Sequence, residues 1–72
     1  MKVGIVGFGS IGTEVAKALI KGVHNFSLYG IVSRSTENAQ KRILQLQHEI
    51  KIYDLETLVN NCDVVIDCAP KE

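Results

Sequence analysis

The hydrophobic and polar positions of the chain follow two alternating periods. Short apolar runs at residues 2–7, 26–33 and 63–70 are typical of strands that are buried on both faces of a parallel sheet. A shorter stretch at residues 49–53 alternates apolar and polar side chains, which predicts a further strand. We therefore expect four strands, separated by segments of a different period.

The segments between these strands have the period of amphipathic helices. Residues 10–22 predict the first helix, and Gly22 is a plausible C-terminal stop. Its expected apolar face is formed by Ile11, Val15, Ala18 and Leu19. This helix would pack its apolar face against the sheet and leave its charged residues in solvent.

Residues that can cap helices stand at the start of the next two segments. Ser35 or Thr36 can cap a helix over residues 35–47, and Asp54 can cap a short helix over residues 54–62. The resulting order is β-α-β-α-β-α-β with short connections, which predicts a three-layer α/β fold with a Rossmann-type parallel sheet. We expect one domain over residues 1–72, with the sheet ending after its fourth strand.

Composition and charge narrow the range of partners. The 72 residues are 46% hydrophobic and 22% charged, and the formal net charge is +0. A neutral chain offers no electrostatic basis for binding nucleic acid or an anionic membrane. No apolar run approaches the ~20 residues that span a bilayer, and no secretory signal precedes the first strand. A cytoplasmic protein is expected.

A glycine motif follows the first predicted strand. Gly7, Gly9 and Gly12 form G-x-G-x-x-G between a strand and a helix, which is the context of a dinucleotide-binding loop. Gly7 would permit the tight turn, Gly9 the approach of a pyrophosphate, and Gly12 close packing of helix on strand. The alternative is a tight turn without a ligand. Phe8, between the first two glycines, is a candidate contact but is expected mainly to shield the loop from water.

The end of the second predicted strand lacks an expected acid. A carboxylate there normally binds the adenosine ribose and favours NAD, but this chain has Ser33, Arg34 and Ser35 instead. A guanidinium flanked by two hydroxyls suits a 2′-phosphate, so the sequence favours NADP, with dual use or NAD as alternatives. Arg34 could also be a solvated loop cation and the serines helix caps, and nearby Glu37 weakens the NADP interpretation.

Taken together, "KVGIVGFGSIG", "LYGIVSRS" and "DVVIDCAP" resemble the N-terminal nucleotide-binding domain of L-aspartate dehydrogenases. The same stretches are similar to that domain in homoserine dehydrogenases and in the glucose-fructose oxidoreductase group. The resemblance implies an NAD(P)-dependent dehydrogenase acting on an amino acid or a similar small polar substrate. It also implies cofactor contacts at the pyrophosphate, the adenosine ribose and the centre of the site. These fall on Gly7, Gly9, Ser10, Ile11, Gly12, Ser33, Arg34, Ala69 and Pro70.

No residue of the chain is a convincing catalytic group. His24 is expected in a surface loop, and His48 precedes a strand, at the edge of the sheet opposite to the usual ligand site. Asp67 is expected to make a hydrogen bond at the end of its strand rather than to act in catalysis. Cys62 and Cys68 lack a metal-binding spacing and are expected to be reduced and partly buried. We expect this chain to bind nucleotide without catalysing a reaction.

Two alternatives remain at the level of sequence. A regulatory module that senses nucleotides would share the glycine loop, although such modules usually keep the acid after the second strand. An unpaired edge on the last strand could also favour pairing between copies of the chain, so a homo-oligomer is possible.

Overall fold

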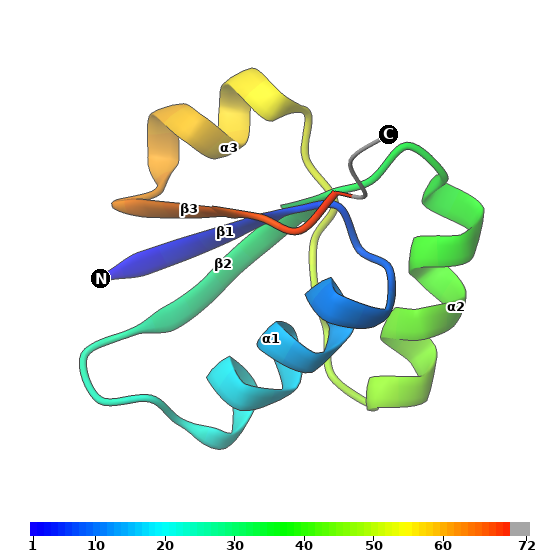
Figure 1. Cartoon of the computed structure of the whole chain (residues 1–72), viewed down its shortest axis with the longest axis horizontal. Helices are drawn as coiled ribbons and strands as arrows, with labels where there is room; N and C mark the ends of the chain where they lie inside the picture. Colours follow the sequence, from blue (N-terminus) through cyan, green and yellow to red (C-terminus); the bar gives the residue numbers. More distant parts are fainter. Residues whose placement is uncertain (70–72) are drawn as a thin grey trace.

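The computed structural model describes residues 1–69 as a small parallel sheet covered by helices (Figure 1). In chain order the elements are β1 (Lys2–Val6), α1 (Ser10–Lys21), β2 (Ser27–Val32), α2 (Thr36–Leu46), α3 (Leu55–Asn61) and β3 (Val64–Asp67). Strands and helices alternate except between α2 and α3, and the strands run parallel. This architecture confirms the predicted α/β class with a Rossmann-type sheet.

The sheet has the strand order β2-β1-β3, so β1 lies in the centre. Because all the pairs are parallel, the carboxyl ends of the strands meet at one edge of the sheet. Two backbone hydrogen bonds connect the segments that leave this edge. The Gly7 N–H donates to the Val32 carbonyl over 2.8 Å, and the Cys68 N–H donates to the Val6 carbonyl over 2.7 Å.

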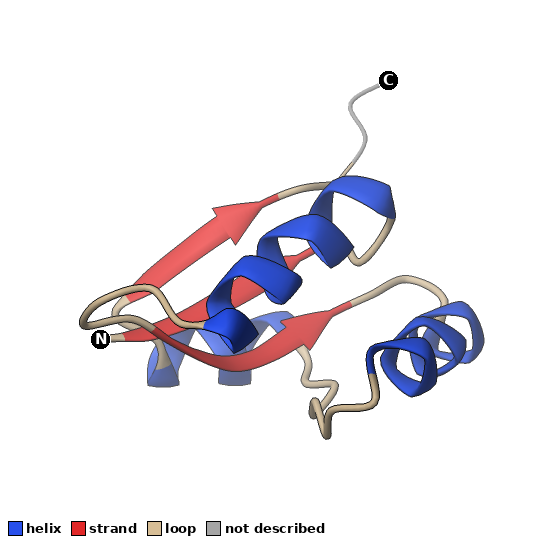
Figure 2. Ribbon diagram, turned by 90° about the horizontal axis from the view of Figure 1, so that it is seen from below, coloured by secondary structure: helices blue, strands red, loops and turns tan. Residues whose placement is uncertain are grey.

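The two faces of the sheet are covered by different helices (Figure 2). Ile5 of β1 is fully buried in the cluster that includes Ala16 of α1. The neighbouring Gly4 faces α3, where a side chain would come within 2.6 Å of Leu58 Cγ. Leu58 is also fully buried, so the absence of a side chain at Gly4 lets α3 pack directly on the central strand.

The buried face of α1 agrees only in part with the expected one. Gly12 and Ala16 are its buried residues, whereas Ile11 is 68% exposed. The reason lies at Gly12, where a Cβ atom would clash with the Gly7 carbonyl oxygen. Val15 and Leu19 pack against the core as predicted, but the prediction that Ile11 and Ala18 lie on the buried face was wrong, because both are exposed.

The strand predicted at residues 49–53 is also wrong, since this segment makes only one parallel bridge, between Ile52 and Ile31 of β2. The Ile31 N–H donates to the Lys51 carbonyl over 3.0 Å, and the Tyr53 N–H donates to the Ile31 carbonyl over 2.8 Å. The ring of Tyr53 occupies the space where Gly30 has no side chain. Asp54 is the N-cap of α3, so the chain enters a helix directly after Tyr53 and cannot extend its pairing with β2.

Helix α2 begins as its sequence predicts and lies beside the glycine loop (Figure 1). Ser35 is its N-cap, and the Ser35 hydroxyl accepts a hydrogen bond from the Asn38 N–H over 3.3 Å. Ala39 is fully buried in one cluster with Phe8 of the loop and Ile50. The start of α2 is therefore held close to the carboxyl edge of the sheet.

Candidate functional site

A cleft of ≈ 430 Å³ opens at the carboxyl edge of the sheet, where ligands of open α/β folds bind. It lies between the glycine loop, the turn from β2 to α2 and the residues after β3. The lining residues are Val6, Gly7, Phe8, Gly9, Val32, Ser33, Arg34, Ser35, Asn38 and Ala69. Its floor is apolar and its rim is polar, a combination typical of sites for small organic ligands.

The glycine loop has the geometry that close backbone approach requires. Gly7 has a φ of 90°, and a Cβ atom there would lie 2.6 Å from the backbone nitrogen of Ala69. Only glycine fits this turn without moving the segment after β3. Gly9, in contrast, has an ordinary extended conformation and no atom within 4 Å of where its Cβ would be. Packing therefore explains Gly7 but not Gly9, which is the N-cap of α1 and has room for a ligand on its open side.

The N-terminus of α1 is open toward solvent. Its N-cap is Gly9, which offers no side-chain oxygen, and the first turn contains no acidic residue. The first intrahelical bond joins the Thr13 N–H to the Gly9 carbonyl over 2.9 Å. The N–H groups ahead of Thr13 have no intrahelical acceptor, so they remain available to an anion. The space at Gly9 and these donors fit a pyrophosphate.

The two serines after β2 are used in local structure. The Ser33 hydroxyl donates to the Ser35 carbonyl over 3.1 Å and accepts from the Ser35 N–H over 3.3 Å. The Ser35 hydroxyl is already an acceptor in the cap of α2. Both hydroxyls therefore shape the turn, and this local role agrees with the helix-cap alternative for the serines.

Arg34 lies on the rim of the cleft and is exposed. Within residues 1–69 no carboxylate lies within salt-bridge distance of its guanidinium, and the only ion pair there joins Lys17 to Glu14. Glu37, in the first turn of α2, is exposed and does not line the cleft. The positive charge of Arg34 is thus available to a ligand in the cleft.

The cleft brings together most, but not all, of the residues that the sequence singled out. Gly7, Phe8, Gly9, Ser33, Arg34, Ser35 and Ala69 all line it. Ser10, Ile11 and Gly12 lie in the first turn of α1 and do not line it, and Pro70 lies outside the described residues. Phe8 is 5% exposed and belongs to the core, so it shields the loop as expected while one side faces the cleft.

One lining residue with hydrogen-bonding chemistry was missed by the sequence analysis. Asn38 stands three residues after the N-cap of α2, and the cleft reaches it. Its position could have been found from the predicted cap, because the third residue of a helix lies close to the turn that precedes it.

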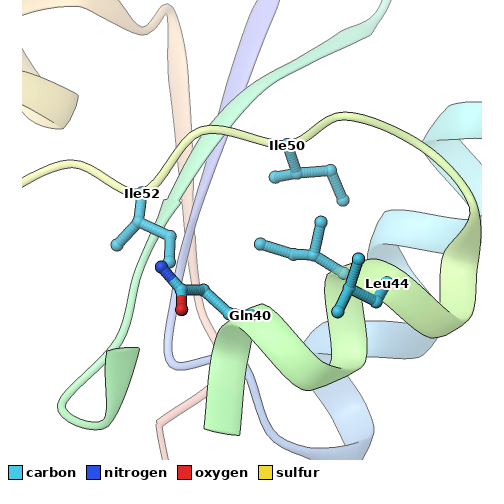
Figure 3. Close-up of a pocket in the computed structure, with 5 residues that line it drawn as sticks. Gln40, Leu44, Ile50 and Ile52 are labelled. Carbon is cyan, nitrogen blue, oxygen red and sulfur yellow. The ribbon is translucent and has the colours of Figure 1, made fainter. Parts of the chain in front are cut away.

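A larger hollow of ≈ 520 Å³ lies on the other side of α2 (Figure 3). It is bordered by Gln40 and Leu44 of the helix and by the segment from Ile50 to Ile52. Its walls carry one amide and otherwise aliphatic side chains. Size alone therefore does not mark the functional site, because this hollow has no charge or backbone donors arranged for phosphates.

The remaining candidate residues do not form a reactive centre within residues 1–69. The Asp67 carboxylate accepts the Ala69 N–H over 3.0 Å at the end of β3, as expected for a structural role. Cys62 and Cys68 are free and partly buried, and burial raises the pKa of both thiols, so they stay protonated. In this part of the chain no three potential metal-binding side chains come together, and no helix is long and apolar enough to cross a membrane.

A comparison with protein families agrees with this geometry. Residues 1–72 match the family described as an oxidoreductase family with an NAD-binding Rossmann fold. The chain belongs to this family. The glycine loop, the open α1 terminus and the cleft therefore belong to a domain whose family binds a nicotinamide dinucleotide.

Similar curated proteins share one name. An L-aspartate dehydrogenase of Methanococcoides burtonii is 30% identical over 100% of this chain, and one of Methanosarcina barkeri is 31% identical over 100%. A third, from Methanocella arvoryzae, is 34% identical over 94% of the chain. These matches confirm the resemblance to that group. The chain spans about a quarter of their length, 25–27%.

Proposed function

We propose that this chain is the cofactor-binding domain of an L-aspartate dehydrogenase-like enzyme and that it prefers NADP. The pyrophosphate would lie over Gly9 and the first turn of α1, where the backbone leaves both space and N–H donors. The 2′-phosphate would lie at the β2–α2 turn. We infer that residues 1–72 form one domain and catalyse no reaction by themselves.

The proposed preference for NADP rests on the surroundings of the Arg34 side chain. Its guanidinium borders the cleft with no carboxylate at salt-bridge distance among residues 1–69, and the residue before it is Ser33 rather than an acid. A phosphate there would meet a planar cation with several donors and no repelling carboxylate. The serines support this site by shaping the turn that presents Arg34.

The proposed substrate class rests on the relatives alone. Three of the matched proteins carry the name L-aspartate dehydrogenase, but about three quarters of their length lies outside the matched region. The lining residues of the cleft include no acid, histidine or lysine. Residues that bind and orient an amino acid would therefore have to come from outside this cleft. A cytoplasmic location and a homo-oligomer remain predictions from the sequence.

The test is a calorimetric titration of the chain with NADPH and, separately, NADH at one fixed salt concentration. We expect NADPH to bind about tenfold more tightly, which corresponds to ~1.4 kcal/mol. Arg34→Ala should remove this difference by weakening NADPH binding while leaving NADH binding almost unchanged.

Arg42→Ala is the matched control, because it removes the same charge from α2 at a residue that does not line the cleft. It should keep the preference for NADPH. If the unmodified chain binds NADH as tightly as NADPH, the proposed preference is wrong and Arg34 is only a surface cation. If both arginine variants lose affinity equally, the effect comes from net charge rather than from a phosphate site.

A further inference from the structure

The polar rim of the cleft contains one side chain that has both a hydrogen-bond donor and an acceptor and takes no part in the local structure of the turn. Asn38 lies in the first turn of α2, exposed and bordering the cleft. Its backbone N–H donates to the Ser35 hydroxyl over 3.3 Å, and this hydrogen bond fixes the position of Asn38 relative to the turn. Among residues 1–69 its side-chain amide makes no hydrogen bond, so both its oxygen and its nitrogen are available to a ligand.

The other polar side chains on the rim are either engaged within the turn or have only donors to offer a ligand. The Ser33 hydroxyl is engaged twice within the turn, and the Ser35 hydroxyl is already an acceptor for the cap. Arg34 has donors only. Asn38 is therefore the rim side chain that presents a free acceptor and a free donor on neighbouring atoms.

An adenine base has the complementary pattern along its edge. Its 6-amino group is a donor and the ring nitrogen N7 is an acceptor, and asparagine forms a bidentate pair with this N6/N7 edge. The cleft also supplies apolar surface for the faces of a base, from Val6, Phe8, Val32 and Ala69. The guanidinium of Arg34 would remain for the phosphate, since the two groups serve different parts of the nucleotide.

We propose that Asn38 recognises the edge of the adenine base, so that the first turn of α2 selects the base of the dinucleotide. This inference rests on the proposed dinucleotide binding and adds base selectivity to it. Hypoxanthine is the informative competitor, because a carbonyl replaces the 6-amino group on the N6/N7 edge, while its added N1–H lies on the other side of that group. That carbonyl would face the Asn38 oxygen or force the amide to turn away from the ring nitrogen.

The experiment is a calorimetric titration of the chain with NADPH and with the reduced hypoxanthine analogue of NADPH. The unmodified chain should bind the adenine form about fivefold more tightly or better, as expected for one bidentate pair at an exposed site. Asn38→Ala should lower the affinity for NADPH to that for the analogue and leave the affinity for the analogue unchanged. Alanine is a strong helix former, so α2 should persist, and circular dichroism can verify this.

Gln40→Ala is the matched control, because it removes an exposed amide from the same helix but on the hollow away from the cleft. It should keep the preference for adenine. The proposal is overturned if the unmodified chain binds both forms equally, or if Asn38→Ala weakens both forms equally. Tight binding of NADPH without base selectivity would refute only this inference, whereas no binding of either form would refute the proposed function as well.

Discussion

Gly9→Ala offers a direct test of whether the glycine loop is shaped for a ligand or only for folding. Gly9 has φ −93° and ψ −151°, an extended conformation with negative φ, and no atom lies within 4 Å of the added methyl group. A weaker N-cap would cost some stability, and the reduced entropy of the unfolded chain would offset part of this cost. We expect a net change in unfolding free energy of within about 1 kcal/mol.

The same methyl group would occupy the space that we assign to the pyrophosphate. We therefore expect Gly9→Ala to lose at least about tenfold in affinity for NADPH, or ~1.4 kcal/mol, measured by calorimetry. Thermal unfolding followed by circular dichroism would report stability, where 1 kcal/mol corresponds to a shift of roughly 4–8 °C in Tm for a domain of this size.

Gly22→Ala is the complementary control. Gly22 also borders open space, but it has a φ of 116° and lies at the far end of α1. Alanine there should cost about 1–3 kcal/mol of stability through backbone strain and leave NADPH affinity intact. Normal NADPH binding by Gly9→Ala would refute the assigned pyrophosphate position. Unfolding of Gly9→Ala would show that this glycine serves the fold.

Two further predictions concern the fold. Leu58→Ala should lower the free energy of unfolding, measured in urea, by about 2–5 kcal/mol, because the Leu58 side chain of α3 is fully buried against β1. A loss below ~1 kcal/mol would show that α3 is not packed on the sheet. Hydrogen bonding with Thr57 holds the pKa of Asp54 below its usual 3.8. The Asp54 carboxylate therefore contributes fully to stability above pH 3.8, and this contribution is lost as the pH falls through the folded-state pKa. Asp54→Asn keeps a capping side chain without this titration, and its Tm should fall less than that of the unmodified chain between roughly pH 5 and pH 2. Parallel pH profiles would contradict the role assigned to Asp54.

The local features of the fold were predictable because they depend on residues close together in the chain. Ser35 and Asp54 cap α2 and α3 as predicted, through hydrogen bonds to N–H groups three residues on. The glycine spacing predicted a strand, a turn and a helix in that order, and these elements are confirmed. In each case the pattern acts within one turn of helix or one tight loop.

Features that depend on distant partners could not be predicted in this way. Residues 49–53 have the alternation of a strand, but the neighbouring edge of β2 accepts them only at Ile31 before α3 begins. The face that α1 buries follows from the contact between Gly12 and the Gly7 carbonyl, which outweighs the apolar side chain of Ile11. A hydrophobic pattern shows that a segment has an apolar side, but not which neighbour it meets.

The candidate site shows the same difference between features that follow from residue identity and features that follow from three-dimensional packing. The sequence alone determined the family resemblance, the glycine loop and the missing acid before Arg34, because each depends on residue identity at fixed spacing. The helix-cap role of Ser35 was likewise predictable, because its hydrogen bond reaches only three residues along the chain. Only the tertiary structure showed that Gly9 borders open space and that Asn38 reaches the cleft. Free volume and the lining of a cleft depend on how segments from three strands meet at one edge of the sheet, and no single segment contains that information.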